Sequence, residues 1–331
     1  MDCIVPGNSV RTITAALCCI SRVGKEVAIE FDPIDGLTMR ALSDSKAAFV
    51  SFHFSPSFFE DCSYRCSAKR GEGSSKRPRT QLRSSQQSQS MSQSESDDHG
   101  RPHWSGCLAV RALGGVVNQR KGVTSLQLAS TDDAVVFRFH IRIQHDASFQ
   151  VSYKIPVSGT KSSTVLTSTR RASEITVHPT VALKMIEPLQ KTAEMALLVN
   201  DNRRYVSSLT FGGTHDRRRT VAEVEATALK TQVTIAYDEL IEVHYQPQQD
   251  SDTNANSQPV DINQRAILVF GMKEFKAMVT FCVQALEHEE LPITLQFHWG
   301  GKPVLLSTTS SGFETTMTVA TLDHTLIRGM T

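Results

Sequence analysis

The chain has 331 residues, of which 40% are hydrophobic and 21% are charged. These values are ordinary for a soluble globular protein, and the length predicts about two domains. The sequence contains no run of about 18 apolar residues, which excludes a membrane-spanning helix, and its start lacks the basic and apolar parts of a secretion signal. Basic and acidic residues number 35 and 34, so the chain is not a wholly cationic nucleic-acid binder, although positive charge can still gather on one surface.

Alternation of apolar and polar residues predicts many strands. A helical spacing of apolar residues predicts four helices, at 8–22, 111–120, 180–191 and 272–286. Gly114 and Gly115 weaken the second helix, and Pro188 leaves open a third helix that ends near Glu187. In chain order, the predicted strands cover residues 2–6, 27–31, 36–42, 49–54, 106–110, 135–143, 149–157, 173–178, 193–200, 204–211, 222–230, 232–245, 267–271, 292–298, 303–309 and 313–322.

The order of these elements repeats along the chain. A strand, a helix and several strands follow one another four times, twice in each half, which predicts an α+β protein built from two topologically equivalent domains with antiparallel sheets. Polar segments of low complexity occupy equivalent places in the two halves, and we expect them to be disordered. The predicted divisions are a first domain at 1–157 with an insert at 67–103, a connector at 158–172, a second domain at 173–322 with a loop at 247–264, and a tail at 323–331.

The four predicted helices and the residues that flank them are biased toward positive charge. They carry ten basic residues against only Glu187 and Glu274. A single helix of this kind is explained by a solvated polar face, but four helices with the same bias indicate a common surface that faces a polyanion such as DNA. The basic residues are Arg11, Arg22, Lys25, Arg111, Arg120, Lys121, Lys184, Lys191, Lys273 and Lys276.

Short motifs near both ends of the chain have a consistent order and spacing. They are Cys3-x-Val5-x-Gly7-x-x-Val10, Ser21-Arg22-Val23-Gly24-x-Glu26, Gly36-Leu37-x-x-Arg40, Ser45-Lys46-x-Ala48-Phe49, Phe52-x-Phe54-x-Pro56-x-Phe58-Phe59, Lys273-Glu274-Phe275-Lys276 with Phe281, Gly301-x-Pro303 and Val319-Ala320-Thr321-Leu322. Together they resemble the Rad-nine-type subunit of the heterotrimeric checkpoint clamp.

The resemblance implies the fold of the sliding clamp proliferating cell nuclear antigen, with helices that line a channel for double-stranded DNA. It also implies a ring completed by Rad-one-type and Hus-one-type subunits, an ATP-driven clamp loader, a checkpoint adaptor or kinase, a nuclear location and a partner-peptide pocket beneath the connector. Members of this family carry a long phosphorylated C-terminal tail, whereas this chain stops nine residues after Leu322. We therefore expect regulation in the insert instead.

The insert contains three Ser-Gln pairs, at Ser85, Ser88 and Ser92. Ser-Gln is the minimal substrate of damage-response kinases, so these serines are candidate phosphosites, and each phosphate would add about −1.5 to −2 charge. The alternative is a spacer rich in Ser and Gln in which such pairs arise from composition. Upstream, a basic cluster fits a short nuclear-import signal; its basic residues are Lys76, Arg77 and Arg79.

The cysteines and the missing enzyme motifs narrow the function. Seven cysteines are too few and too scattered for a disulfide scaffold, and adjacent Cys18 and Cys19 suit a reducing compartment, so we expect free thiols. A zinc site is weakly suggested, but the residues between the two ligand pairs lack the compact hairpin and helix of a finger. The four residues in question are Cys62, Cys66, His99 and His103.

We expect no catalytic residue, metal or cofactor. The sequence lacks a phosphate loop, a GxSxG elbow and an HExxH motif, and no trustworthy pattern of acidic residues indicates a two-metal nuclease. Two alternatives stay open, namely a replicative clamp of three identical subunits and, with far less support, a damage-processing nuclease.

Overall fold

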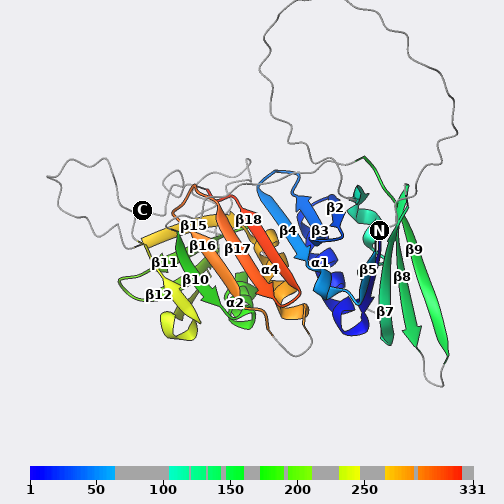
Figure 1. Cartoon of the computed structure of the whole chain (residues 1–331). Coiled ribbons are helices and arrows are strands. Elements are labelled where there is room, and N and C mark those ends of the chain that lie inside the picture. Colours follow the sequence, from blue (N-terminus) through cyan, green and yellow to red (C-terminus); the bar gives the residue numbers. More distant parts are fainter. Residues whose placement is uncertain are drawn as a thin grey trace, which may run out of the picture.

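The computed structural model of the protein describes residues 1–63, 104–118, 121–131, 133–142, 147–159, 172–189, 193–210, 231–246, 265–286 and 290–322 (Figure 1). The described residues of the first half form one α-helix and short 3₁₀ turns between antiparallel strands. Its elements are β1 (Asp2–Pro6), η1 (Gly7–Ser9), α1 (Val10–Val23), β2 (Glu26–Asp32), β3 (Gly36–Leu42), β4 (Ala48–Phe54), η2 (Pro56–Phe58), β5 (Asp61–Ser63), β6 (Trp104–Ala109), η3 (Val110–Leu113), β7 (Val123–Ser130), β8 (Ala134–Arg142) and β9 (Ser148–Pro156).

The second half has the same alternation of strands and helical segments. Its elements are β10 (Ser173–Val177), α2 (Pro179–Ile186), η4 (Glu187–Leu189), β11 (Glu194–Asn200), β12 (Tyr205–Thr210), β13 (Gln232–Ala236), η5 (Tyr237–Glu239), β14 (Glu242–His244), β15 (Arg265–Gly271), α4 (Met272–Gln284), β16 (Ile293–Phe297), β17 (Val304–Ser310) and β18 (Phe313–Val319). Among the described residues, no helix is long and apolar enough to cross a membrane.

The strand order of the first half recurs in the second. In the first half, β5-β1-β7-β8-β9 are hydrogen-bonded neighbours in one sheet and β4-β3-β2-β6 in another. The second half has β14-β10-β16-β17-β18 and β13-β12-β11-β15, which is the same order with every strand number raised by nine. The repeated pattern of strand, helix and strands in the sequence therefore corresponds to two units of one topology.

The two units join edge to edge. Strand β18 pairs antiparallel with β4, from Phe313 opposite Phe54 to Val319 opposite Ala48, and this pairing fuses two of the sheets into one of nine strands. The Phe281 ring of α4 lies 4.9 Å from that of Phe52 and 6.0 Å from that of Phe313, measured between ring centroids. Aromatic pairs in this range add attraction to apolar burial, so the hydrophobic core is continuous across the junction.

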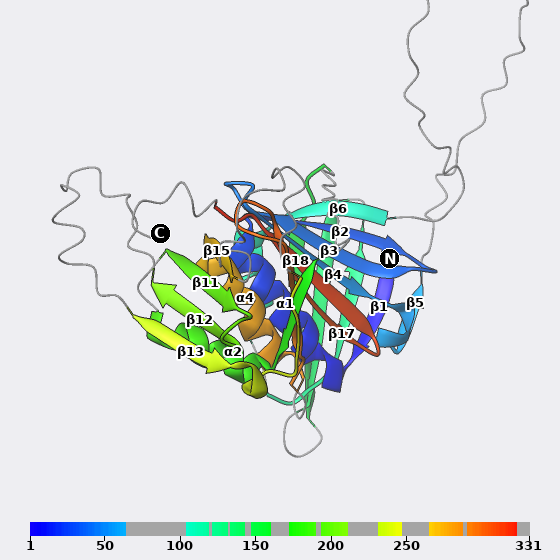
Figure 2. The ribbon, with the colours of Figure 1, turned by 90° about the vertical axis from the view of Figure 1, so that its left-hand side faces the viewer.

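The helices share one side of the sheets. Helix α4 packs against both α1 and α2, and Figure 2 shows α1 and α4 side by side. Most of α1 is buried because its apolar residues recur at helical spacing around Ile13, Leu17 and Ile20. The alternating strands place their apolar residues on the helix side and their polar residues outward, as in β2, where Val27, Ile29 and Phe31 are buried and Glu30 and Asp32 point outward.

Three sequence predictions about the elements were wrong. The second helix is only the 3₁₀ turn η3, because Gly115 lies where a Cβ would meet the ring of Tyr153 at 2.4 Å. Residues 232–245 are two strands, β13 and β14, which the turn η5 sends into different sheets. Strands β5 and β7 were missed. The third helix ends at Ile186, so the alternative of an early end was correct.

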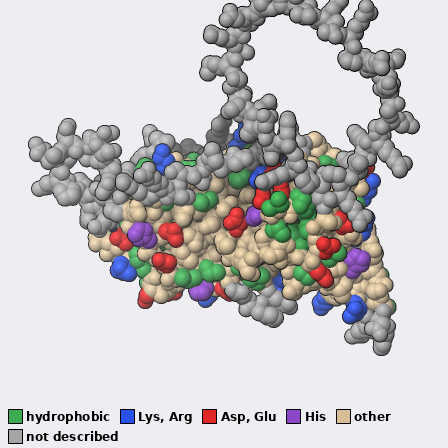
Figure 3. All heavy atoms as spheres, viewed as in Figure 1, with side chains coloured by type: hydrophobic (Ala, Val, Ile, Leu, Met, Phe, Trp, Pro, Cys, Tyr) green, Lys and Arg blue, Asp and Glu red, His purple; other side chains and the backbone are tan. Residues whose placement is uncertain are grey.

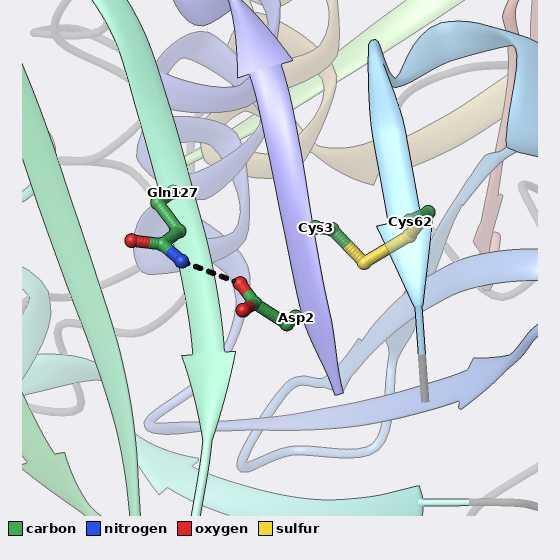
Figure 4. Close-up of a disulfide and its surroundings, with 4 residues drawn as sticks. All are labelled: Asp2, Cys3, Cys62 and Gln127. Atoms are coloured by element: carbon green, nitrogen blue, oxygen red, sulfur yellow. Dashed lines mark hydrogen bonds between the residues drawn. A yellow bond between two sulfur atoms is a disulfide. The ribbon is translucent and has the colours of Figure 1, made fainter. Parts of the chain in front are cut away.

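The cysteine prediction was wrong at one pair. Cys3 of β1 lies directly opposite Cys62 of β5, with 4.1 Å between the Cα atoms, and the two form a disulfide (Figure 4). Strand pairing, which spacing in the sequence does not reveal, brings together two residues 59 positions apart. Cys62 is therefore no zinc ligand, and Cys66, His99 and His103 lie outside the described residues.

Candidate nucleic-acid interface

Helix α1 exposes one narrow basic stripe. All of this helix is buried except Arg11, Cys18, Ser21 and Arg22, which are half-buried. Arg11, Cys18 and Arg22 follow one another along one face, because at about 3.6 residues per turn their separations are close to two turns and to one turn. Arg22 lies in the last helical turn, where a cation also interacts favourably with the helix dipole.

Arg11 has a structural role that sequence reasoning missed. Its Nε donates a hydrogen bond of 2.7 Å to the carbonyl oxygen of Gln284, and the Thr12 hydroxyl donates one of 2.7 Å to the carbonyl oxygen of Ala285. These carbonyls belong to the C-terminal end of α4, which lacks intrahelical partners for them. The start of α1 therefore caps the end of α4, and Arg11 joins the two halves while its positive charge stays close to the helix surface.

Helices α2 and α4 add further cations on the same side of the sheets. Lys184 of α2 and Lys273 of α4 are exposed, and Lys276 is half-buried. Glu274 stands in the first turn of α4, where a carboxylate is stabilised by the helix dipole. The exposed Glu187 follows α2 in the turn η4.

The remaining predicted cations are less uniform. Arg111 in η3 and Lys121 before β7 are exposed. Lys25 follows α1 and forms an ion pair with Asp44, whose hydrogen bond and charge raise the pKa of Lys25. This pair contributes little net charge to the surface. Arg120 and Lys191 lie outside the described residues, as do the candidate phosphosites Ser85, Ser88 and Ser92 and the import signal Lys76, Arg77 and Arg79.

The outward face of the nine-stranded sheet has the opposite charge. Figure 3 shows this face in the view of Figure 1, with carboxylates spread over the strands. Arg40 is a basic residue of this face and pairs with Glu30. Cations on the helix side and carboxylates on the outward side of the nine-stranded sheet give these two faces different electrostatic potentials. The outward carboxylates are those of Glu26, Glu30, Asp32, Glu174, Glu242 and Glu314.

A small hollow marks the place where the connector begins. Its volume is about 190 Å³. Ser158 pairs with Cys107 of β6 at its border. The hollow therefore lies next to the start of the predicted connector, most of which is outside the described residues. The lining residues are Glu26, Ala28, Arg40, Ala41, Leu42, Phe49 and Cys107.

The sequence matches the family model described as Rad9 over residues 13–322. The chain belongs to the Rad9 family. Its fold is similar to that of the proliferating cell nuclear antigen of Thermococcus kodakaraensis, with a TM-score of 0.63, 9% identity and coverage of 97% of this chain and 99% of the other. For the PCNA2–PCNA3 complex of Sulfolobus tokodaii the TM-score is 0.62, the identity 10%, and the coverage 97% of this chain and 99% of the other. For proliferating cell nuclear antigen of Entamoeba histolytica the TM-score is 0.61, the identity 9%, and the coverage 97% of this chain and 98% of the other.

These likenesses confirm two sequence predictions. The Rad9-type resemblance is shown by the family match, and the sliding-clamp fold by structures that cover nearly the whole of both chains. The protein is therefore a clamp subunit of the Rad9 family. The identity to the solved structures is low, so the structural agreement shows the fold and leaves the role of individual residues to the geometry of this chain.

Proposed function

We propose that this protein is one arc of a heterotrimeric ring that encircles DNA without catalysing a reaction, and that it acts in the damage checkpoint and in repair. The observation that carries the proposal is the junction between its two halves. Strand β18 of the second unit pairs with β4 of the first. In the repeat, β9 is the equivalent of β18 and β13 is the equivalent of β4.

Both equivalent strands are edges. Among the described residues, β9 pairs only with β8 and β13 only with β12. Figure 1 shows β9 at the right-hand end of the molecule and β12, the neighbour of β13, toward the left-hand end; Figure 2, viewed from that left-hand side, labels β13 beside β12. An open edge is a template for another chain. A head-to-tail contact between different patches generates a ring when the rotation closes, so β9 of one subunit and β13 of the next would repeat the β18–β4 junction.

The backbone of each edge strand is oriented for such a pairing of β9 with β13 of the next subunit, which we call the seam. The hydrogen bond from Thr210 N–H to the Thr231 carbonyl, 2.9 Å long, and that from Tyr237 N–H to the Arg204 carbonyl, 3.1 Å long, fix the phase of the β12–β13 ladder. Because bonding alternates along an antiparallel strand, Thr234 directs its N–H and carbonyl away from β12.

The same reasoning applies to β9. The hydrogen bond from Val157 N–H to the Asp133 carbonyl fixes the phase of the β8–β9 ladder. Ser152, which lies opposite Arg138, therefore directs its N–H away from β8. Unpaired donors and acceptors on both edges are what a strand of a neighbouring subunit needs.

Proline substitutions test the seam. Thr234→Pro and Ser152→Pro each remove one outward N–H while they leave the internal ladders bonded. We expect each to weaken the contact with one neighbour by about tenfold or more, because a ladder bond is lost and the proline ring obstructs the approach. Thr234→Ala and Ser152→Ala keep the N–H and serve as matched controls. Unchanged assembly of both proline variants would contradict the proposed seam.

The basic helix side supports the DNA-encircling part of the proposal. A ring holds DNA by topology, so weak and salt-sensitive contacts with phosphates are sufficient. Arg22→Glu, Lys184→Glu and Lys273→Glu together should shorten retention on circular DNA and leave ring assembly intact. The control is Glu314→Lys on the outward face. Failed assembly of the triple variant would mean that these side chains are structural.

The checkpoint part of the proposal is supported by family membership. Rad-one-type and Hus-one-type subunits would complete the ring, an ATP-driven loader would place it at damaged DNA, and an adaptor or kinase would read it in the nucleus. Phosphorylation at Ser85, Ser88 and Ser92 would supply the signal. Mapping phosphorylation after damage, followed by replacement of the three serines with alanine, tests this part. Normal checkpoint signalling by the triple alanine variant would remove the insert from the proposal.

A further inference from the structure

Strand β8 carries a positive strip on its outward face. Arg138, His140 and Arg142 alternate with the buried Phe137, Phe139 and Ile141, so the three basic side chains all point to the side of the sheet away from the core. Arg142 is exposed, and Arg138 and His140 are half-buried. We call these three residues the β8 strip. Alternate residues of a strand are about 6.8 Å apart, so two guanidinium groups and an imidazole are held in a row.

The neighbours of the strip are uncharged hydrogen-bonding side chains. Arg138 lies between Gln127 of β7 and Ser152 of β9, and His140 lies between Ser125 and Gln150. Opposite charges are the usual cross-strand partners of a basic residue on a sheet surface. In this sheet the cross-strand positions beside the cations hold serine and glutamine, which supply donors for an anion but do not neutralise the strip.

Two other outward cations of the sheets, Arg40 and Lys154, have a carboxylate partner. Arg40 on β3 pairs with Glu30. Lys154, on the same face as the strip, pairs with Asp133 at 3.3 Å, and the hydrogen bond from Thr131 together with Lys154 lowers the pKa of that carboxyl. The strip differs from both, because within the described residues neither Arg142 nor His140 forms an ion pair.

Arg138 is held in place by a relay of hydrogen bonds. Its Nη1 donates to Gln127 Oε1 at 3.1 Å, and Gln127 Nε2 donates to Asp2 Oδ1 at 2.7 Å; Figure 4 shows the second of these bonds. The amide of Gln127 separates the arginine from the carboxylate of Asp2. Arg138 is therefore oriented and still carries its positive charge at the surface.

A hollow of about 470 Å³ lies at the end of the strip. Hydroxyl, guanidinium, imidazole and amide groups surround it. Arginine with hydroxyl donors is the combination that binds phosphate in proteins, because its planar fork fits two phosphate oxygens. The hollow is lined by Thr124, Ser125, His140, Ile141, Arg142, Ser148, Phe149 and Gln150.

We infer that the β8 strip binds an extended, phosphorylated acidic peptide segment of a partner protein. Alternate side chains of an extended peptide have the same spacing as those of β8, so phosphorylated or acidic residues at every second position would each face one side chain of the strip, a guanidinium or the imidazole. Arginine clusters are a recurrent means of recognising such segments.

Single-stranded nucleic acid fits this face less well. Binding of single strands relies on aromatic side chains that stack with successive bases. The outward positions of β7, β8 and β9 around the strip hold Ser, Gln, Val, Ala and Lys besides its own three residues. Phe149 shares the inward side with its cross-strand partner Ile141. The outward face also lies on the opposite side of the sheet from the helices, so its use does not depend on DNA in a channel.

Fluorescence anisotropy with the full chain tests the inference. The probe is a labelled ten-residue peptide with phosphoserine and glutamate at alternate positions, compared with the same peptide carrying unmodified serine. We expect at least about tenfold tighter binding of the phosphorylated probe, since a charge-assisted hydrogen bond supplies that factor or more. Arg138→Gln/Arg142→Gln should remove the difference, and Lys154→Gln on the same face should change it by less than about twofold, because its charge is already compensated.

A second variant guards against loss of folding. Arg142→Gln alone alters an exposed residue outside the hydrogen-bond relay and should still weaken the phosphorylated probe by about tenfold. Equal affinity for the two peptides would overturn the inference. A ten-nucleotide single-stranded DNA that binds as tightly as the phosphopeptide, and loses affinity in the same variants, would also overturn it in favour of a nucleic-acid site.

Discussion

The two halves of the molecule have one strand order but place their long helices differently. In the first half, α1 has 14 residues and the helical element near the open edge, η3, has 4. In the second half, α2 next to β12 and β13 has 8 residues and α4 has 13. The two long helices meet at the internal junction, and the two short elements lie near the edge strands β9 and β13.

This difference indicates a division of roles. The internal junction combines strand pairing, helix packing, aromatic contacts and the cap that Arg11 and Thr12 provide for α4. In the part of the chain that the structure describes, the equivalent outer edges have open backbone groups and less helix behind them. A permanent contact is thus built with a large apolar core, while contacts between subunits would use a similar strand pairing with less buried surface.

The largest expected effect is at the junction core. Phe281→Ala removes a ring that is 1% exposed and contacts Phe52 and Phe313 from opposite halves. We expect the free energy of unfolding to fall by about 3–5 kcal/mol. The matched control is Phe149→Ala at the outer end, where the ring is 45% exposed; it should stay within about 0.5 kcal/mol. Denaturant titration measures both, and similar losses in the two variants would contradict a junction-centred core.

The next effect concerns the disulfide, which only the first half has. Cys3 pairs with Cys62, whereas the equivalent cross-strand pair in the second half is Ile175 with Val243. Reduction of the disulfide should lower the free energy of unfolding by about 2–4 kcal/mol. Cys62→Ser should have the reduced stability from the outset and no further response to reductant. A wild-type protein that melts identically with and without reductant would show that the bond does not stabilise this half.

A smaller effect separates the two arginines of α1. Arg11→Met removes a hydrogen bond to the end of α4 and should cost about 1 kcal/mol of stability, while Arg22→Met should cost less than about 0.5 kcal/mol. Both changes remove one positive charge from the helix side, so both should weaken salt-sensitive contact with DNA. Equal stability of the two variants would mean that the cap contributes nothing across the junction.

The smallest effect is alkaline destabilisation of the second half. Burial, with a further contribution from the charge of Asp201, raises the pKa of Tyr237 in η5; in the first half the equivalent turn, η2, carries Phe58. The neutral phenol is favoured in the folded state, so its contribution is complete below about pH 10 and is lost as the unfolded chain ionises above that value. We expect a loss of about 1 kcal/mol by pH 11 after allowance for partial solvent screening. Tyr237→Phe should remove this part of the pH dependence.

Local patterns in the sequence predicted much of the fold. Alternation located strands such as β8, and helical spacing located α1 and α4 within a few residues. Strand β7 was missed because Leu126 and Leu128 alone carry its alternation. The helix expected after β6 is only the turn η3, because two successive glycines disfavour a helix and Gly115 packs against the ring of Tyr153 from β9, a contact between distant segments.

The site was predictable only in part. Charge bias along the helices pointed to one basic side, but the cap made by Arg11, the ion pair of Lys25 and the open edges depend on register and packing. These are properties of strand order and of segments far apart in the sequence, so no local pattern contains them. The alternating basic residues of β8 were visible as a strand, while the uncharged neighbours of the strip became apparent only with the sheet register.

The most direct test of the central claim is the mass of the assembly in solution. The chain should be mixed with Rad-one-type and Hus-one-type subunits, and the mass measured by light scattering. We expect one complex with one copy of each subunit. We expect this complex to be lost or weakened with Thr234→Pro but not with Thr234→Ala. A stable assembly of this chain alone, with three times its mass of 36.5 kDa, would contradict the heterotrimeric ring.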